Sequence, residues 1–321
     1  MTRPTIMFGD EGSFVTEVQT CLEITVDGEF GRQTERAVMT FQTAQRITSD
    51  GIVGPHTWAK FEEVYELPPY PPPPPPPLDP TLTNAIKQIA GQSEIARYSW
   101  DDRGQAPLAY TQGIALAFAD AVQRYLAGDS SAIEMAKANT HDADVDVLSW
   151  YAGFFRDLGM DNSVDGLDTL RHLFAFMLGL GMRESSGQYC CGRDMSASNV
   201  SSDTAEAGLF QMSWNAASSS DEMQKLMDQY STCPSPQCLS EVFSQGVECS
   251  SSEWDCYGSG DGYRYQQMAK QCPIFATHCA AIGLRNLRQH WGPVNRYEVE
   301  LKREADAMLA VVQELVTPPS V

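Results

Sequence analysis

One glutamic acid in this sequence stands where a side chain could act as a proton donor. Glu184 follows the apolar run Leu173–Leu180 and precedes Ser185, Ser186 and Gly187. A carboxyl group at the end of a buried apolar helix is partly desolvated, which raises its pKa toward neutral pH. Cleavage of a glycosidic bond needs such a protonated acid beside the leaving oxygen. We therefore interpret Glu184 as a candidate general acid; an exposed carboxylate at a helix end is the alternative.

A second polar segment, Gly208–Gln211 with the sequence Gly-Leu-Phe-Gln, follows in the same half of the chain. Gly208 would permit a sugar to approach the backbone closely. The amide of Gln211 can both donate and accept hydrogen bonds, either with an N-acetyl group or with the candidate acid. Ser185 and Ser186 could contact the same substrate, or they could simply cap the turn in which they lie.

A second carboxylate would be needed if the reaction were an inverting hydrolysis, because a base must then activate water. Asp203, Glu206 and Asp194 are the candidates, and Asp203 is preferred. Each of these acids could equally be a solvated loop residue or a cap. Further along, Trp291 could stack on a sugar ring or could pack in the core.

Other chemistries find less support in the sequence. Only five histidines occur, none of them in a His-Glu-x-x-His pattern, which argues against a zinc amidase or peptidase. The adjacent pair His278-Cys279 does not by itself supply the geometry of a thiol enzyme. No metal or organic cofactor is implied.

The segments Arg183–Gly187 and Gly208–Gln211 together resemble the active-site core of the lysozyme-like superfamily, in particular goose-type lysozymes and soluble lytic transglycosylases. The resemblance implies one catalytic glutamic acid, Glu184, and cleavage between N-acetylmuramic acid and N-acetylglucosamine. One aspartate of the goose-type family falls on Ser213 and is therefore absent, and the other falls nearest Ser202 or Asp203. A lytic transglycosylase needs no such base, because the sugar's own 6-hydroxyl closes a 1,6-anhydro ring. Hydrolysis and transglycosylation both stay open, as do a catalytically inactive wall-binding protein and a chitinase-like glycosidase.

The elements that must position these residues are predicted to be mostly helical, so we expect a mainly all-α fold. Apolar spacing predicts helices over approximately 81–97, 108–127, 131–140, 145–158, 167–181, 221–230, 263–282 and 297–316. The helix before Glu184 is apolar nearly all round, which is typical of a buried core helix. Gly179 and Gly181 are expected to loosen its end. Residues 187–262 are rich in Ser, Gly and Cys and predict loops held by disulfides.

The first part of the chain contains a near-repeat. Asp27-Gly28 and Asp50-Gly51 each predict a turn, and Thr34 and Thr57 are expected to cap the helices that follow. Residues 1–67 are similar throughout to the type 1 peptidoglycan-binding domain, a small three-helix module. The resemblance implies that the glycan strands of peptidoglycan are the partner.

A proline-rich stretch at 68–80 separates the two parts. It includes an unbroken run from Pro71 to Pro77, which favours a stiff polyproline II rod. A recognition motif for a proline-binding partner is the alternative. The predicted organisation is therefore a wall-binding domain at 1–67, a linker at 68–80 and a larger, loop-rich, disulfide-stapled, lysozyme-like catalytic domain at 81–321.

Cysteines are concentrated in the C-terminal half, which predicts a disulfide framework formed in an oxidising compartment. The eight clustered residues are Cys190, Cys191, Cys233, Cys238, Cys249, Cys256, Cys272 and Cys279. Reduced structural thiols and zinc ligation are the alternatives.

The net charge of −20 disfavours nucleic acid as a partner, because phosphates would be repelled. No apolar run is long enough to predict membrane insertion, and the N-terminus lacks the layout of a signal peptide. We expect a monomer that is made in the cytoplasm and acts in the periplasm or cell wall, as a phage lysin or a contact-delivered toxin would.

Overall fold

The computed structural model describes residues 3–67, 78–193, 201–217, 220–230 and 235–317. Most of the predicted linker, together with Asp194 and Cys233, lies outside these ranges. The chain folds into two compact units, Met1–Pro74 and Pro75–Val321. Each unit has its own hydrophobic core.

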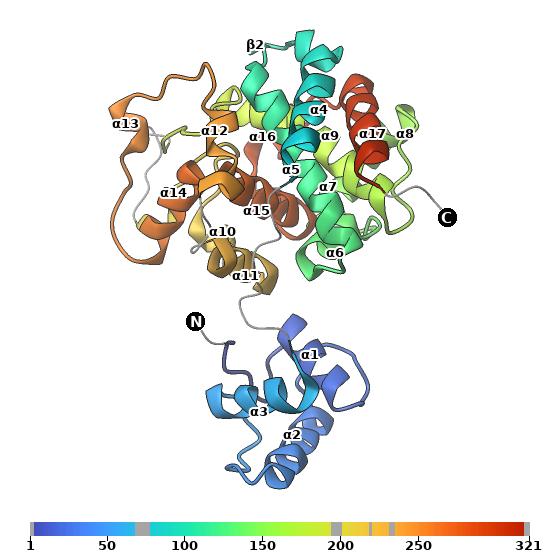
Figure 1. Ribbon diagram of the computed structural model, residues 1–321, viewed down its shortest axis with the longest axis vertical. Helices are drawn as coiled ribbons and strands as arrows, with labels where there is room; N and C mark the ends of the chain where they lie inside the picture. The colour runs from blue at the N-terminus through green and yellow to red at the C-terminus, as the bar shows by residue number, and fades with distance from the viewer. Residues whose placement is uncertain (1–2, 68–77, 194–200, 218–219, 231–234, 318–321) are drawn as a thin grey trace. The chain divides into compact units, whose positions relative to one another are not determined.

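The first unit is a three-helix module, as the sequence predicts (Figure 1). Its helices are α1 (Ser13–Cys21), α2 (Arg32–Ala44) and α3 (Pro55–Tyr65). Apolar residues from all three helices and from the turns between them fill its core, which includes Val15, Val18, Phe30, Val38, Phe41, Val53, Trp58 and Phe61.

The near-repeat of this unit is organised by a buried glutamine in each half. In the first half, the Nε2 of Gln19 donates to the carboxylate of Asp27 (2.6 Å) and to the hydroxyl of Thr34 (3.1 Å). The Oε1 of Gln19 accepts from the backbone N–H groups of Asp27 and Gly28. One side chain therefore holds the Asp-Gly turn against the start of the next helix.

Gln42 repeats this arrangement in the second half. Its Nε2 donates to Asp50 (2.8 Å) and Thr57 (3.1 Å), and its Oε1 accepts from the N–H of Gly51 (2.9 Å). The expected capping of α2 and α3 by the two threonines is wrong, because glycines occupy both N-cap positions without a side-chain cap. Each threonine hydroxyl belongs to the glutamine network instead.

The second unit is mostly helical, as predicted (Figure 1). Its α-helices are α4 (Pro80–Gln92), α5 (Leu108–Leu126), α6 (Ser130–Ala136), α7 (Val147–Trp150), α8 (Ala152–Asp157), α9 (Leu167–Ser185), α10 (Trp214–Ala217), α11 (Asp221–Tyr230), α12 (Ser240–Phe243), α13 (Ser251–Trp254), α14 (Asp261–Gln271), α15 (Pro273–Asn286), α16 (Gly292–Asn295) and α17 (Arg303–Val316). Short 3-10 helices are η1 (Ile95–Arg97), η2 (Ser202–Thr204), η3 (Ser235–Cys238) and η4 (Arg288–His290). In the described residues, one small antiparallel sheet pairs β1 (Ser99–Trp100) with β2 (Gly104–Gln105).

Helix α9 is largely buried in this unit, and α5 and α17 both pack against it (Figure 1). Leu173 and Leu180 are fully buried, as the apolar pattern predicts. The helix does not loosen at its glycines. Gly179 and Gly181 lack a Cβ at the points where Glu300 and Tyr110 approach α9, so they serve close packing and the helix continues to Ser185.

Two predicted helices are each divided in the structure. The stretch 263–282 forms α14 and α15, which meet at Cys272 because Pro273 lacks the N–H needed to continue α14 and is well placed to begin α15. The stretch 145–158 forms α7 and α8, which are separated at Tyr151.

Two disulfides confirm that cross-links hold the loop-rich region. Cys190 pairs with Cys249, and Cys238 pairs with Cys272 at the junction of α14 and α15. Among the described cysteines, the free thiols are Cys21, Cys191, Cys256 and Cys279. The predicted framework is thus present in part.

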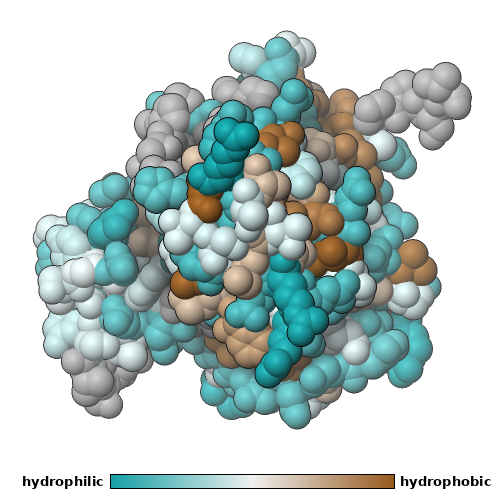
Figure 2. All heavy atoms as spheres, turned by 90° about the horizontal axis from the view of Figure 1, so that it is seen from below, coloured by the Kyte–Doolittle hydropathy of each residue, from teal (hydrophilic) through white to brown (hydrophobic). Residues whose placement is uncertain are grey.

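The surface is largely hydrophilic on the face shown in Figure 2, where apolar residues occur in small groups among polar ones. Within the described ranges, we find no helix with the length and apolar character needed to cross a membrane.

Candidate active site

Glu184 lies in the last turn of α9 rather than in the loop after it. The helix ends because Ser186 adopts the left-handed conformation (φ 53°) and Gly187 follows with φ 75°. Their N–H groups donate back to the carbonyl oxygens of Met182 and Gly181 respectively, which satisfies the end of the helix. The backbone of Glu184 therefore belongs to the hydrogen-bonded last turn of α9.

Burial raises the pKa of Glu184 to about 8, and the negative charge of Glu206 adds to this effect. The guanidinium groups of Arg103, Arg296 and Arg183 act in the opposite direction but do not cancel it. Glu184 is thus half-buried and protonated at neutral pH, in the direction that its place after an apolar helix predicts.

A tight turn lies against the end of α9. It begins and ends at an isolated bridge between Ala207 and Met212. The hydroxyl of Ser185 donates to the carbonyl oxygen of Leu209 (2.8 Å), which joins the turn to the helix residue next to Glu184. The structure therefore brings together the two segments that the sequence singles out.

Two further hydrogen bonds support this turn from the opposite side. The indole N–H of Trp291 donates to the carbonyl oxygen of Phe210 (2.8 Å), and the Nε2 of His290 lies 3.2 Å from the carbonyl oxygen of Gln211. Burial lowers the pKa of His290, so the ring is neutral and Nε2 donates to this carbonyl. The segment 288–292 thus buttresses the turn that lies against α9.

Several residues predicted to contact substrate have structural roles instead. Trp291 is 2% exposed, so the predicted stacking on a sugar is corrected: the ring packs in the core beneath the turn. Ser185 is buried and its hydroxyl is occupied by Gly181 and Leu209. A Cβ on Gly208 would lie 2.7 Å from the carbonyl oxygen of Ala269, so the lack of a side chain here permits close packing against α14.

Gln211 and Ser186 differ in how much of each remains accessible. The Nε2 of Gln211 donates to the carbonyl oxygen of Gly208 (2.9 Å), and the side chain is buried inside its own turn. Ser186 is half-buried at the end of α9, with no side-chain hydrogen bond among the described residues. Of the two, Ser186 is the better placed to meet a substrate.

The structure separates the candidate bases. Glu206 is the acid that raises the pKa of Glu184 most, and its carboxylate lies 3.9 Å from the Nε2 of His290. Asp203 is exposed on η2, where its carboxylate lies 3.4 Å from the hydroxyl of Ser202. Of these two candidates, Glu206 is therefore the one whose charge acts on Glu184.

Three arginines lie near Glu184, and only Arg183 belongs to a segment that the sequence singles out. Arg103 lies in the turn between β1 and β2, and its guanidinium donates to the carbonyl oxygen of Arg183 (2.8 Å). Arg183 and Arg296 both form ion pairs with Glu298, at 3.4 and 2.8 Å. Arg183 is adjacent to Glu184 in the sequence, whereas the other two come from distant segments that no local pattern links to the acid.

Across the described residues, no group of three or more His, Cys, Asp or Glu side chains is arranged to hold a metal ion.

Residues 12–61 match the family described as "Putative peptidoglycan binding domain". An uncharacterised protein from the bpoA1 3' region of Kitasatospora aureofaciens is 57% identical over 37 residues, which is 12% of this chain and 31% of that protein. A zinc D-Ala-D-Ala carboxypeptidase from Streptomyces albus G is 35% identical over 71 residues, or 20% of this chain and 27% of that enzyme. The chain therefore spans less than a third of the length of either curated relative.

Among solved structures, a Burkholderia AP3 phage endolysin aligns over 98% of this chain and 99% of its own, at 15% identity and a TM-score of 0.19. At that score, the superposition supports no inference about fold or activity.

Proposed function

We propose, from the premise that residues 12–61 form a domain of the peptidoglycan-binding family, that this chain is a wall-directed glycosidase. Its N-terminal unit binds peptidoglycan, and its second unit cleaves the bond between N-acetylmuramic acid and N-acetylglucosamine. The observation that supports the enzymatic part is the place of Glu184 in the last turn of α9, where burial and the nearby Glu206 raise its pKa to about 8.

In the proposed reaction, Glu184 donates its proton to the glycosidic oxygen as the bond from that oxygen to the anomeric carbon breaks. The carboxylate left on Glu184 then lies near Arg103, Arg183 and Arg296, whose charges favour the ionised form. Positive charge that is already in place therefore stabilises the state created by proton transfer.

Glu206 supplies the base if the reaction is a hydrolysis. Its carboxylate takes a proton from water while the water oxygen bonds to the anomeric carbon. His290 is neutral and cannot cancel the charge of Glu206. Burial and, after it, the negative charge of Glu206 raise the pKa of Glu184, which is the direction that a proton donor beside a carboxylate needs.

Transglycosylation is the second candidate. The position of the absent family aspartate, Ser213, is buried, and its hydroxyl donates to Asn215 (2.6 Å). Asp203, the other acid suggested by the resemblance, lies on the exposed η2. If Glu206 does not act as a base, the sugar's own 6-hydroxyl oxygen bonds to the anomeric carbon and gives its proton to the carboxylate left on Glu184, so no second acid is needed.

Mass spectrometry of the fragments released from purified sacculi tests these proposals. Wild type, Glu184→Gln and the control Glu314→Gln, which changes an exposed glutamate on α17, are compared in parallel. Reducing muramic acid ends support hydrolysis, and 1,6-anhydro ends support transglycosylation. Cleavage of chitin but not sacculi would indicate a chitinase-like enzyme. Products that persist in Glu184→Gln, or no products from wild type, would contradict the proposed role of Glu184.

A further inference from the structure

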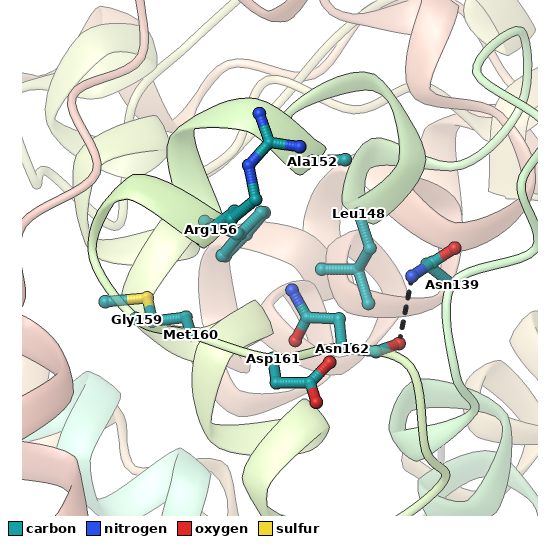
Figure 3. A pocket seen from close by; sticks show the side chains of 9 residues that line it. Asn139, Leu148, Ala152, Arg156, Gly159, Met160, Asp161 and Asn162 are labelled. Carbon is teal, nitrogen blue, oxygen red and sulfur yellow. Dashed lines mark hydrogen bonds between the residues drawn. The ribbon is translucent and has the colours of Figure 1, made fainter.

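A cavity of about 300 Å³ is lined by residues of α7 and α8 and by the segment 159–162, which precedes α9 in the chain (Figure 3). This volume is at the lower end of the range for small-molecule sites. The lining combines apolar side chains with an arginine and two asparagine amides, and consists of Asn139, Leu148, Ala152, Phe155, Arg156, Gly159, Met160, Asp161 and Asn162.

The amide of Asn162 has a fixed orientation at this cavity. Its Oδ1 lies 2.7 Å from the Nδ1 of His172, while the guanidinium of Arg171 donates to the Nε2 of the same ring. His172 therefore carries its proton on Nδ1 and donates it to Asn162, so the amide nitrogen faces the other way. Figure 3 shows this nitrogen directed toward the side of the cavity on which Arg156 lies.

This nitrogen is a donor without a protein acceptor among the described residues. Asn162 as a whole is only 5% exposed, yet this nitrogen is not among the fully buried atoms that lack a partner, so it is open to the cavity. Its own backbone carbonyl already accepts from the backbone N–H and the side-chain amide of Asn139. The donor that faces the cavity is therefore available to a bound molecule.

Arg156 provides a positive charge at the rim. It is exposed on α8 and has no carboxylate partner in the parts of the chain that the structure describes. Asp161 lies on the opposite side of the cavity in Figure 3, and its carboxylate accepts from the backbone N–H of Ser163 (2.9 Å). Leu148 and Phe155, which are both buried, contribute to the apolar wall.

We propose that this cavity binds a small acyl amide that carries a carboxylate. Its carbonyl oxygen accepts from the amide nitrogen of Asn162, a methyl-sized group contacts the wall formed by Leu148 and Phe155, and the carboxylate pairs with Arg156. Two wall components present this chemistry: N-acetylmuramic acid, through its acetamido and lactyl groups, and the alanyl end of a stem peptide. The choice of these two rests on the proposed function, whereas the cavity itself involves no residue of the Glu184 site.

Nuclear magnetic resonance titration of the full-length protein tests the proposal. The acids N-acetylmuramic acid and N-acetyl-D-alanine are each compared with a neutral counterpart, N-acetylglucosamine and N-acetyl-D-alanine amide. At least one acid should shift the backbone resonances of residues 159–162 and the side-chain amide of Asn162. Its neutral counterpart should bind about tenfold more weakly, the size expected for one charge-assisted hydrogen bond. Which acid binds identifies the source of the ligand.

Arg156→Gln should reduce the affinity for the acid to that of its neutral counterpart. Arg97→Gln, which changes another exposed arginine without a carboxylate partner among the described residues, should leave the affinity unchanged. The proposal is overturned if neither acid shifts these resonances, if the neutral compounds bind equally well, or if Arg156→Gln binds like wild type. Binding does not require turnover, so Glu184→Gln should retain it. If the acid binds in this cavity but the protein does not digest sacculi, the proposed glycosidase activity is rejected while the proposed binding site is supported.

Discussion

At the scale of single residues, Glu184 shows how one carboxyl group is kept protonated by its surroundings. Burial at the end of α9 and the nearby charge of Glu206 both raise its pKa, and three arginines limit the rise. Because the active form of a general acid is the protonated one, activity should depend on this balance.

The rate of glycan cleavage should therefore fall as the pH rises through about 8, where Glu184 loses its proton. Arg296→Gln removes a positive charge that lowers this pKa, so the alkaline limb of the profile should move to higher pH. The pH dependence of kcat/KM on soluble glycan fragments measures the effect, with Arg97→Gln as the matched control. If kcat/KM instead fell near pH 4.5, the ordinary carboxyl pKa, the group that limits activity at high pH would not be a Glu184 with a raised pKa.

Glu206→Gln should shift the same limb in the opposite direction, because it removes the negative charge that raises the pKa of Glu184. If Glu206 is also the base, this substitution should abolish the reducing products. Asp203→Asn should change neither the limb nor the products, since Asp203 is exposed on η2. The reverse pattern, with Asp203 essential and Glu206 dispensable, would restore the base that the resemblance suggests.

Glu184 should also make the folded state less stable as the pH rises. The pKa of Glu184 is about 8 in the folded protein and 4.5 ordinarily, so the folded state binds this proton more tightly than the unfolded state. The resulting contribution to the free energy of unfolding is complete below pH 4.5, and it is lost as the pH rises from 4.5 to about 8. Glu184→Gln should therefore raise the free energy of unfolding above pH 8 by about 1–2 kcal/mol, allowing for partial solvent screening. Thermal unfolding at about pH 5 and at about pH 9 checks this, and an equal effect at the two values would contradict it.

At the scale of elements, the N-terminal unit depends on two equivalent glutamine networks. Gln42→Leu leaves Asp50, Gly51 and Thr57 without their shared partner, which should cost about 1–3 kcal/mol in local stability. Native-state hydrogen exchange of the full chain should show faster exchange across residues 50–57. Gln33→Leu, which changes an exposed residue on the same helix, provides the comparison. Equal exchange rates in the two variants would contradict a stabilising role of the Gln42 network.

The helix that bears Glu184 depends equally on its packing. Because Gly179 and Gly181 accept the close approach of Glu300 and Tyr110, α9 continues to Ser185 and places the acid on rigid backbone. The bond from Ser185 to Leu209 then sets the distance between this helix end and the turn that lies against it.

At the scale of the whole molecule, binding and cleavage should be separable. A truncated protein that begins at Leu78 keeps the cap of α4, because the side chain of Asp79 accepts from the N–H groups of Thr81 and Leu82. It should lose most of its affinity for sacculi while retaining its rate on small soluble fragments, since tethering acts through local concentration. Sedimentation with sacculi and fragment assays measure the two properties, and a parallel loss of both would contradict a two-module protein.

The sequence by itself determined the features that depend on local patterns. Apolar spacing predicted the helical character of both units, the Asp-Gly repeat marked the N-terminal module, and the position of Glu184 after an apolar run predicted the direction of its pKa. Each of these follows from residues close together in the chain. The clustering of cysteines likewise indicated disulfides in the correct region.

Only the tertiary structure decided the features that depend on contacts between distant segments. Trp291 and Gln211 have residue types suited to sugar binding, but burial commits them to the turn beside Glu184. Glu206, and not the exposed Asp203, is the acid whose charge raises the pKa of Glu184, and Arg103 and Arg296, from remote parts of the chain, lower it. Local sequence shows which groups a side chain carries. Only the fold determines which charges and hydrogen-bond partners surround those groups, and these surroundings set their pKa values and their accessibility.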